Sequence, residues 1–207
     1  MKIGVLALQG AFVEHVRILQ NIGVQAAEIR LPREMEDVDG IIIPGGESTT
    51  ISKLMGLYGF VDPIRAFART GAVWGTCAGM IVMAKAIYGE TPCLSLMDIA
   101  VERNAFGRQV DSFEESLEVP ELQNGTVRPF PGVFIRAPKL IRAGKGTAII
   151  AKLKNGDAVA ALQGRMLVTA FHPELSTDDR FHRFFIELVH NPADYKPEFR
   201  LDVVYPS

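Results

Sequence analysis

The sequence predicts an α/β protein in which helices cover both faces of a mostly parallel sheet. Short apolar runs at residues 3–8, 24–29 and 40–43 alternate with longer segments, as in a series of βαβ units. Glycine-rich turns follow two of the apolar runs, at residues 44–46 and 75–79. Ligands of such sheets bind outside the carboxyl ends of the strands, so both turns are expected at one functional edge.

Composition limits the classes of protein to consider. The chain has 207 residues, a hydrophobic fraction of 48% and a formal net charge of −2, which suit a soluble domain without a nucleic-acid or membrane surface. No apolar run approaches the ~18 residues that a membrane span needs. The two cysteines, Cys77 and Cys93, form no disulfide framework and favour a cytoplasmic protein.

The first half of the chain alternates strands and helices. After the strand at residues 3–8, a helix carries Phe12, Val16, Leu19 and Ile22 on one stripe, with His15 off that stripe. Strands follow at 24–29 and 40–43, then a helix at 61–68 and an apolar strand at 72–74. A helix-compatible run then continues from residue 81 to residue 86.

After Tyr88 the pattern changes to short strands, predicted at 99–101, within 113–136, and at 148–153, 158–163 and 166–171. Asn155-Gly156 is a hairpin signal. A last helix carries an apolar stripe of Phe181, Phe184, Phe185, Leu188 and Val189, with His182 and His190 off it and predicted to face solvent. Asp178 and His182 lack a third ligand, so no metal site is expected.

Residues 72–86 predict a strand, a sharp turn and a helix, with Cys77 at the apex of a Gly-x-Cys-x-Gly turn. This arrangement is typical of a nucleophile elbow in which sulfur replaces the serine hydroxyl. The start of the helix favours a thiolate and offers N–H groups to an oxyanion. A buried structural cysteine at a tight turn is the alternative.

The loop Pro44-Gly45-Gly46-Glu47-Ser48-Thr49 places backbone N–H groups at the same edge. Such a loop binds an anion or an oxyanion, or is a plain turn into a capped helix. Further along the chain, Phe171-His172-Pro173-Glu174 ends an apolar strand. In an extended chain His172 and Glu174 point the same way, so the carboxylate can orient the imidazole. A solvated strand end is the other interpretation.

Together these elements supply a nucleophile, a base with its orienting carboxylate and an oxyanion site, which suit acyl transfer through a thioester. The motifs also resemble a known family. The Gly-Thr-Cys-Ala-Gly elbow with a later His-Pro-Glu is similar to the triad (class I) glutamine amidotransferases. Within them, the blocks at 4–11, 44–49, 102–109, 133–138 and 171–175 resemble the glutaminase subunits of pyridoxal 5′-phosphate synthases, and the resemblance runs from residue 3 to about residue 190.

The resemblance implies a flavodoxin-like three-layer αβα sandwich, with an amidotransferase domain at 1–190 and an irregular tail at 191–207. It implies that Cys77, His172 and Glu174 form the catalytic triad and that the N–H groups of Gly46 and Ala78 form the oxyanion hole. It places L-glutamine on residues from three segments, which are Gly46, Glu47, Ser48, Arg103, Ile135 and Arg136. Either arginine suits the substrate carboxylate.

The resemblance further implies hydrolysis of L-glutamine to L-glutamate and ammonia without a cofactor. The ammonia would pass to a synthase (lyase) subunit in a large hetero-oligomer, which joins it with a pentose phosphate and a triose phosphate to make pyridoxal 5′-phosphate. The glutaminase would be nearly silent until that partner docks. Three alternatives remain: a glutaminase serving another synthase, a cysteine hydrolase on a related sandwich, and a non-catalytic binding module.

Overall fold

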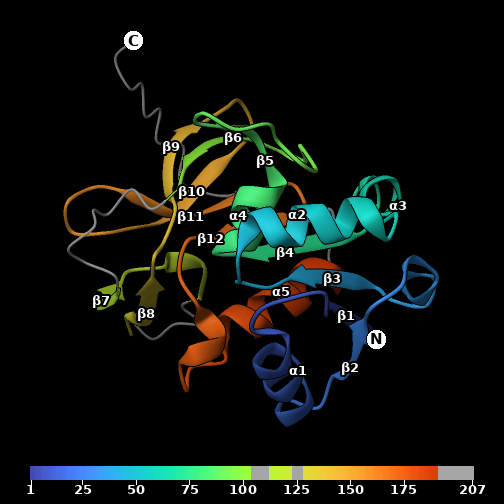
Figure 1. Cartoon of the computed structure of the whole chain (residues 1–207). Helices are drawn as coiled ribbons and strands as arrows, with labels where there is room; N and C mark the ends of the chain where they lie inside the picture. Colours follow the sequence, from blue (N-terminus) through green and yellow to red (C-terminus); the bar gives the residue numbers. More distant parts are fainter. Residues whose placement is uncertain (104–111, 123–127, 191–207) are drawn as a thin grey trace.

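The computed structural model describes residues 1–103, 112–122 and 128–190 (Figure 1). The predicted tail at 191–207 and most of the block at 102–109, which carries part of the family resemblance, lie outside these residues. The helices are α1 (Phe12–Asn21), α2 (Ser48–Leu57), α3 (Val61–Phe67), α4 (Ala78–Met83) and α5 (Arg180–His190), with 3-10 turns η1 (Pro32–Met35), η2 (Pro120–Leu122) and η3 (Pro173–Leu175).

The strands form a large mixed sheet and a small hairpin. The large sheet has the order β2-β1-β3-β4-β12-β11-β9-β6-β5, and β10 pairs with β11. Its members are β1 (Lys2–Leu6), β2 (Gln25–Ile29), β3 (Gly40–Ile43), β4 (Ala72–Thr76), β5 (Ala84–Ile87), β6 (Met97–Glu102), β9 (Lys139–Ala143), β10 (Ala148–Lys152), β11 (Ala158–Gln163) and β12 (Met166–Thr169). The hairpin pairs β7 (Ser112–Leu117) with β8 (Phe130–Ile135).

The half of the sheet that carries the predicted site is parallel. Parallel pairing joins, in this order, β2, β1, β3, β4 and β12. Antiparallel pairing joins β12 to β11, β11 to β9 and β9 to β6. Figure 1 shows α1 and α5 on one face of this half and α2, α3 and α4 on the other. The predicted sheet with helices on both faces is therefore confirmed, with an antiparallel extension.

Complete burial explains the continuous apolar runs. Strands β3 and β4 are buried at every residue, because helices cover both of their faces. The predicted stripe of α5 is also confirmed, since its five apolar side chains are all buried. Trp74 of β4 is fully buried and packs on the rings of Phe181 and Phe185.

Two elements differ from the sequence prediction. The run at 81–86 was expected to continue the helix, but α4 ends at Met83 and Ala84–Ile87 forms strand β5 beside β6. The freed carbonyls of Val82 and Met83 accept hydrogen bonds from the N–H groups of Leu94 and Leu96, at 3.0 and 2.9 Å. Strand β9 was not predicted at all, because its charged residues hide the apolar pattern.

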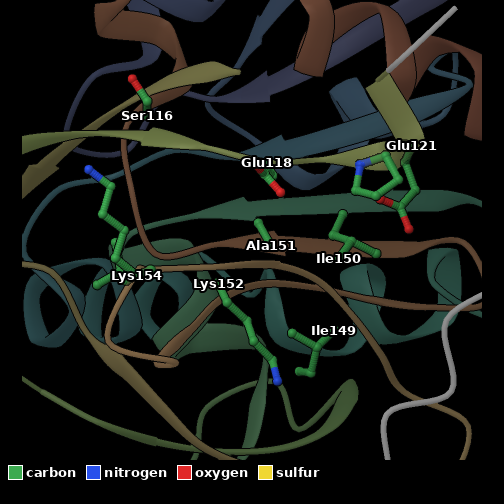
Figure 2. A pocket seen from close by; sticks show the side chains of 10 residues that line it. Ser116, Glu118, Glu121, Ile149, Ile150, Ala151, Lys152 and Lys154 are labelled. Carbon is green, nitrogen blue, oxygen red and sulfur yellow. The ribbon is translucent and has the colours of Figure 1, made fainter. Parts of the chain in front are cut away.

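A cavity of about 430 Å³ lies between residues 116–121 and strand β10. Figure 2 shows Ile149, Ala151 and Lys152 of this strand along it, with Glu118 and Glu121 opposite. None of the site residues predicted from the sequence lines this cavity. The candidate site is therefore the edge where the parallel strands end.

Candidate active site

The predicted site residues follow the carboxyl ends of adjacent parallel strands. The Gly45-Gly46 loop follows β3, Cys77 follows β4, and His172 and Glu174 follow β12, which pairs with β4. A hydrogen bond of 2.9 Å from the Gly45 N–H to the Thr76 hydroxyl joins the first two segments. The expectation that both glycine-rich turns meet at one sheet edge is confirmed.

Cys77 occupies the strained apex expected of a nucleophile elbow. Its φ of 47° and ψ of −102° lie in a region that side chains rarely adopt, and its N–H donates to the Thr169 carbonyl at 2.8 Å. A Cβ at Gly79 would collide with the carbonyl oxygen of Ile43. Glycine at that position therefore lets α4 approach the sheet and aim its N-terminus at the apex.

His172 and Glu174 form the predicted pair, but not through an extended chain. His172 Nδ1 lies 2.7 Å from Glu174 Oε1. Strand β12 ends at Thr169, and Pro173 begins the 3-10 turn η3 that contains Glu174. The i, i+2 strand geometry assumed from the sequence is thus wrong, and the turn brings the carboxylate back to the ring. A solvated strand end is excluded, because both residues are buried.

Burial and charge act in opposite directions on His172. Burial disfavours the imidazolium, but hydrogen bonds and charge interactions with Cys77 and Glu174 outweigh it and raise the pKa of His172 to about 10. His172 is therefore a cation at neutral pH, held between a thiol group and a carboxylate.

This pKa predicts how stability depends on pH. The folded pKa of about 10 exceeds the usual value of 6.5, so the stabilisation from charged His172 is complete below 6.5 and is lost as pH rises through about 10. We expect the difference in unfolding free energy between the natural chain and His172→Asn to be largest at low pH and to shrink over this interval. Urea unfolding at a series of pH values measures it. A difference that does not change with pH would contradict the prediction.

Two backbone N–H groups are available for an oxyanion. The Gly45 carbonyl accepts from the Ala11 N–H at 3.0 Å, which fixes the orientation of the Gly45–Gly46 peptide. Within the described part of the chain, the N–H groups of Gly46 and Ala78 have no hydrogen-bond partner. A Cβ at Gly45 would collide with the His172 ring and lie 3.3 Å from Cys77 Cβ, so this loop packs directly on the triad.

Glu47 and Arg103, two of the predicted substrate-binding residues, contact each other. Arg103 Nη2 donates to Glu47 Oε1 at 2.9 Å, and Nη1 donates to Glu90 at 2.8 Å. Glu47 also caps α2 through the N–H groups of Thr49 and Thr50. Burial opposes its charge, but these threonine hydrogen bonds lower the pKa of Glu47 to about 2. Arg103 is thus engaged by two carboxylates in this state.

Ile135 and Arg136, at the end of strand β8, lie next to Cys77. The Ile135 carbonyl oxygen is 3.8 Å from Cys77 Sγ, and Arg136 adopts a φ of 42°. Among the described residues, the Arg136 guanidinium has no ion-pair or hydrogen-bond partner, and the residue is exposed. Ser48, the remaining predicted residue, is buried at the start of α2.

Three residues of the site were missed or misjudged in the sequence. Gln9 accepts from the Glu47 N–H at 2.7 Å, although the sequence suggested only the end of a strand. His182 was predicted to face solvent, but it is fully buried, and its Nε2 lies 2.9 Å from Nδ1 of His15, which is also fully buried. The contact joins residues 167 positions apart, so no local pattern could indicate it. His190 is exposed as predicted.

Other kinds of site find no support in the described ranges. There, no group of three or more His, Cys, Asp or Glu side chains could hold a metal ion. A helix with the length and apolar character of a membrane span is likewise absent from those ranges.

Comparison with known proteins gives one consistent result. The model of the SNO glutamine amidotransferase family matches residues 5–191. A protein of Dehalococcoides mccartyi strain 195, named "Pyridoxal 5′-phosphate synthase subunit PdxT", is 52% identical over 201 residues, which cover 95% of this chain and 100% of that protein. A protein of the same name from Chloroflexus aurantiacus is 51% identical and covers 91% of this chain and 100% of its own length.

Solved structures agree with the sequence relatives. A crystal structure described as a glutamine amidotransferase superposes with a TM-score of 0.85 at 48% identity, covering 91% of this chain and 99% of that one. A chain from the structure of PurLQS of Thermotoga maritima has a TM-score of 0.64 at 14% identity, covering 90% and 97% of the two chains. The second likeness concerns the fold alone. The fold is therefore that of class I glutamine amidotransferases.

Proposed function

The chain belongs to the SNO glutamine amidotransferase family, and we propose that it hydrolyses L-glutamine to L-glutamate and ammonia as the glutaminase subunit of a pyridoxal 5′-phosphate synthase. The observation that carries this proposal is the buried Cys77–His172–Glu174 constellation, together with the N–H groups of Gly46 and Ala78, which have no hydrogen-bond partner among the described residues. We assign the activity to residues 1–190, and no cofactor takes part in it. The irregular tail proposed for residues 191–207 lies outside the described residues.

The geometry suggests how each group contributes to the reaction. The Cys77 thiolate attacks the side-chain amide carbon of glutamine, and the N–H groups of Gly46 and Ala78 stabilise the oxyanion. His172 donates its proton to the leaving nitrogen, which departs as ammonia and leaves a thioester. His172 then takes a proton from water, which attacks the thioester and releases glutamate and the thiolate. Glu174 orients the imidazole throughout.

The guanidinium of Arg136, which has no partner within the described ranges, suits the α-carboxylate of glutamine better than that of Arg103 does. Arg103 is already paired with Glu47 and Glu90, whereas Arg136 follows the carbonyl that contacts Cys77. Glu47, Ser48 and Gly46 complete the proposed binding site together with Ile135. The Glu47 carboxylate suits the α-ammonium group of the substrate, and Arg103 holds that carboxylate in place.

Replacing Arg136 tests this assignment. We expect Arg136→Gln to raise the KM for glutamine by about 10- to 100-fold with a smaller change in kcat, because a charge-assisted contact to bound substrate is lost. Steady-state glutamate release measures both constants. The matched control is Arg142→Gln, since Arg142 is a surface arginine paired with Asp98. An unchanged KM in the Arg136 variant would assign the carboxylate to another group.

The relatives' names supply the partner in this proposal. They are named as subunits of pyridoxal 5′-phosphate synthase, so we propose that this chain docks on a separate synthase subunit, to which it delivers ammonia. That subunit joins the ammonia with a pentose phosphate and a triose phosphate within a hetero-oligomer. Cytoplasmic localisation belongs to the same proposal, because Cys77 and Cys93 are free thiols.

The test is glutamate release from L-glutamine by the chain alone and after addition of a pyridoxal 5′-phosphate synthase subunit. We expect low activity alone and a marked rise with that subunit. High activity that does not respond to the subunit would keep the glutaminase and discard this partner, favouring a glutaminase that serves another synthase. No release in either case would favour a different thiol hydrolase or a binding module.

A further inference from the structure

The triad carboxylate has one oxygen that the catalytic pair does not use. Glu174 Oε1 contacts His172, but Oε2 is buried and has no hydrogen-bond partner in the described part of the chain. The Glu174 side chain is 0% exposed, so water does not reach this oxygen. Burying a carboxylate oxygen without a hydrogen-bond donor costs free energy. A donor close to this oxygen is therefore expected to affect the triad.

That donor is on His15. His15 Nε2 lies 3.4 Å from Glu174 Oε2 and 3.4 Å from the Thr76 hydroxyl oxygen. The same hydroxyl accepts from the N–H of Gly45. His15 thus lies between the triad carboxylate and the residue that anchors the oxyanion loop. All of these side chains come from different elements, α1, η3 and β4, and are buried.

The partners of the two His15 nitrogens, Glu174 and His182, determine which nitrogen carries the proton. A carboxylate only accepts, so Nε2 of His15 bears hydrogen toward Glu174 and its Nδ1 accepts. The Nε2–H of His182 then donates to this Nδ1, at 2.9 Å. His182 Nδ1 is left as an unpartnered acceptor among the described residues, which costs less than an orphaned N–H. We assign these tautomers from the partners of each ring.

We propose that His15 is a positioning residue of the triad, which holds Glu174 and Thr76 through Nε2–H and is itself held by His182. The inference rests on the proposed function, because the positioned groups are its catalytic base and oxyanion loop. A long contact in the free enzyme is expected to shorten when substrate is bound. His15 acts through Glu174 and does not touch the reacting atoms.

Neutral histidines suit this role because they orient the carboxylate without cancelling its charge. Burial, followed by the charges of His182 and His172, lowers the pKa of His15 well below its usual value, and burial lowers that of His182 to about 3. The charge of Asp179 acts against burial at His182 and raises the pKa of that ring. Trp74 packs edge-on against both rings, with centroid distances of 5.5 and 5.0 Å. A cationic His15 would instead compete with His172 for Glu174.

Two substitutions at His15 separate the effect of its hydrogen-bond donor from the effect of its packing. His15→Leu has a similar volume without a donor, and His15→Gln keeps an amide N–H near the position of Nε2. With the synthase subunit present, we expect His15→Leu to lower kcat by about 10- to 100-fold with little change in KM, and His15→Gln to restore most of it. Equal kcat values for the natural chain and His15→Leu would overturn the proposal, as would equal loss in both variants.

Leu19→Ala is the matched control, because Leu19 is also fully buried on α1, one turn beyond His15. It should lower thermal stability while leaving kcat unchanged. A kcat loss in Leu19→Ala as large as that of His15→Leu would reduce the effect to helix packing and overturn the positioning role. If His15→Leu does not fold, His182→Leu provides the comparison, with the exposed His190→Leu as its control on α5. His182→Leu should then lower kcat and His190→Leu should not.

A measurement without turnover separates this inference from the proposed function. The proton between His172 Nδ1 and Glu174 should give a low-field ¹H NMR signal, which we expect to shift or broaden in His15→Leu and to persist in Leu19→Ala. An unaltered signal in His15→Leu would refute positioning even if glutaminase activity is confirmed. Absence of glutamate release by the natural chain, with a signal that depends on His15, would refute the function and keep the positioning role.

Discussion

Replacing Cys77 with alanine is expected to abolish glutamate release while leaving the fold intact. Without the sulfur no thioester forms, and the remaining groups cannot replace a covalent step, so kcat should fall by at least about 10⁴-fold. The backbone at this position is strained with either residue, because a φ of 47° is unfavourable for alanine as it is for cysteine. The free energy of unfolding should therefore change little.

The control for this substitution is Cys93→Ala, which removes the second, half-buried thiol of the chain. It should retain activity, and mass spectrometry after incubation with glutamine should find a glutamyl adduct in Cys93→Ala and none in Cys77→Ala. Full activity in the Cys77 variant would remove the basis of the proposed chemistry.

Replacing Glu174 with glutamine should have the second largest effect, a fall of roughly 10³- to 10⁴-fold in kcat. Glutamine keeps the volume but removes the charge that, with Cys77, raises the pKa of His172. The imidazole loses the carboxylate contact at 2.7 Å that orients it, and it loses part of its basicity. The KM for glutamine should change much less, because Glu174 lies behind His172 and does not contact the substrate.

Steady-state kinetics across pH measures this effect. In Glu174→Gln the alkaline limb of activity should move from about pH 10 toward lower pH, as the pKa of His172 falls toward its usual value of 6.5. Glu187→Gln, an exposed position on α5, is the charge-matched control and should behave as the natural chain does. A variant at Glu174 with normal kcat and an unshifted alkaline limb would show that the carboxylate does not serve the base.

The sequence alone determined the elements whose signals are local. The elbow at Cys77 could be predicted because strand, glycines and helix lie within fifteen residues, and β3 and β4 because complete burial leaves continuous apolar runs. The sequence also indicated His172 and Glu174, although their contact arises in the 3-10 turn η3 and not in an extended strand. Roles for Arg103 and Arg136 came only from the resemblance, since an isolated arginine has no local signature.

Tertiary structure decided whatever depends on which elements face each other. Helical periodicity placed His15 and His182 off the apolar stripes, and so predicted that His182 faces solvent. In the structure α1 and α5 pack on the same face of the sheet and enclose both imidazole rings over Trp74. The pairing of Arg103 with Glu47 likewise joins residues 56 positions apart. Periodicity reports the average environment of one helix, whereas a buried polar contact depends on a partner that only the folded chain brings within reach.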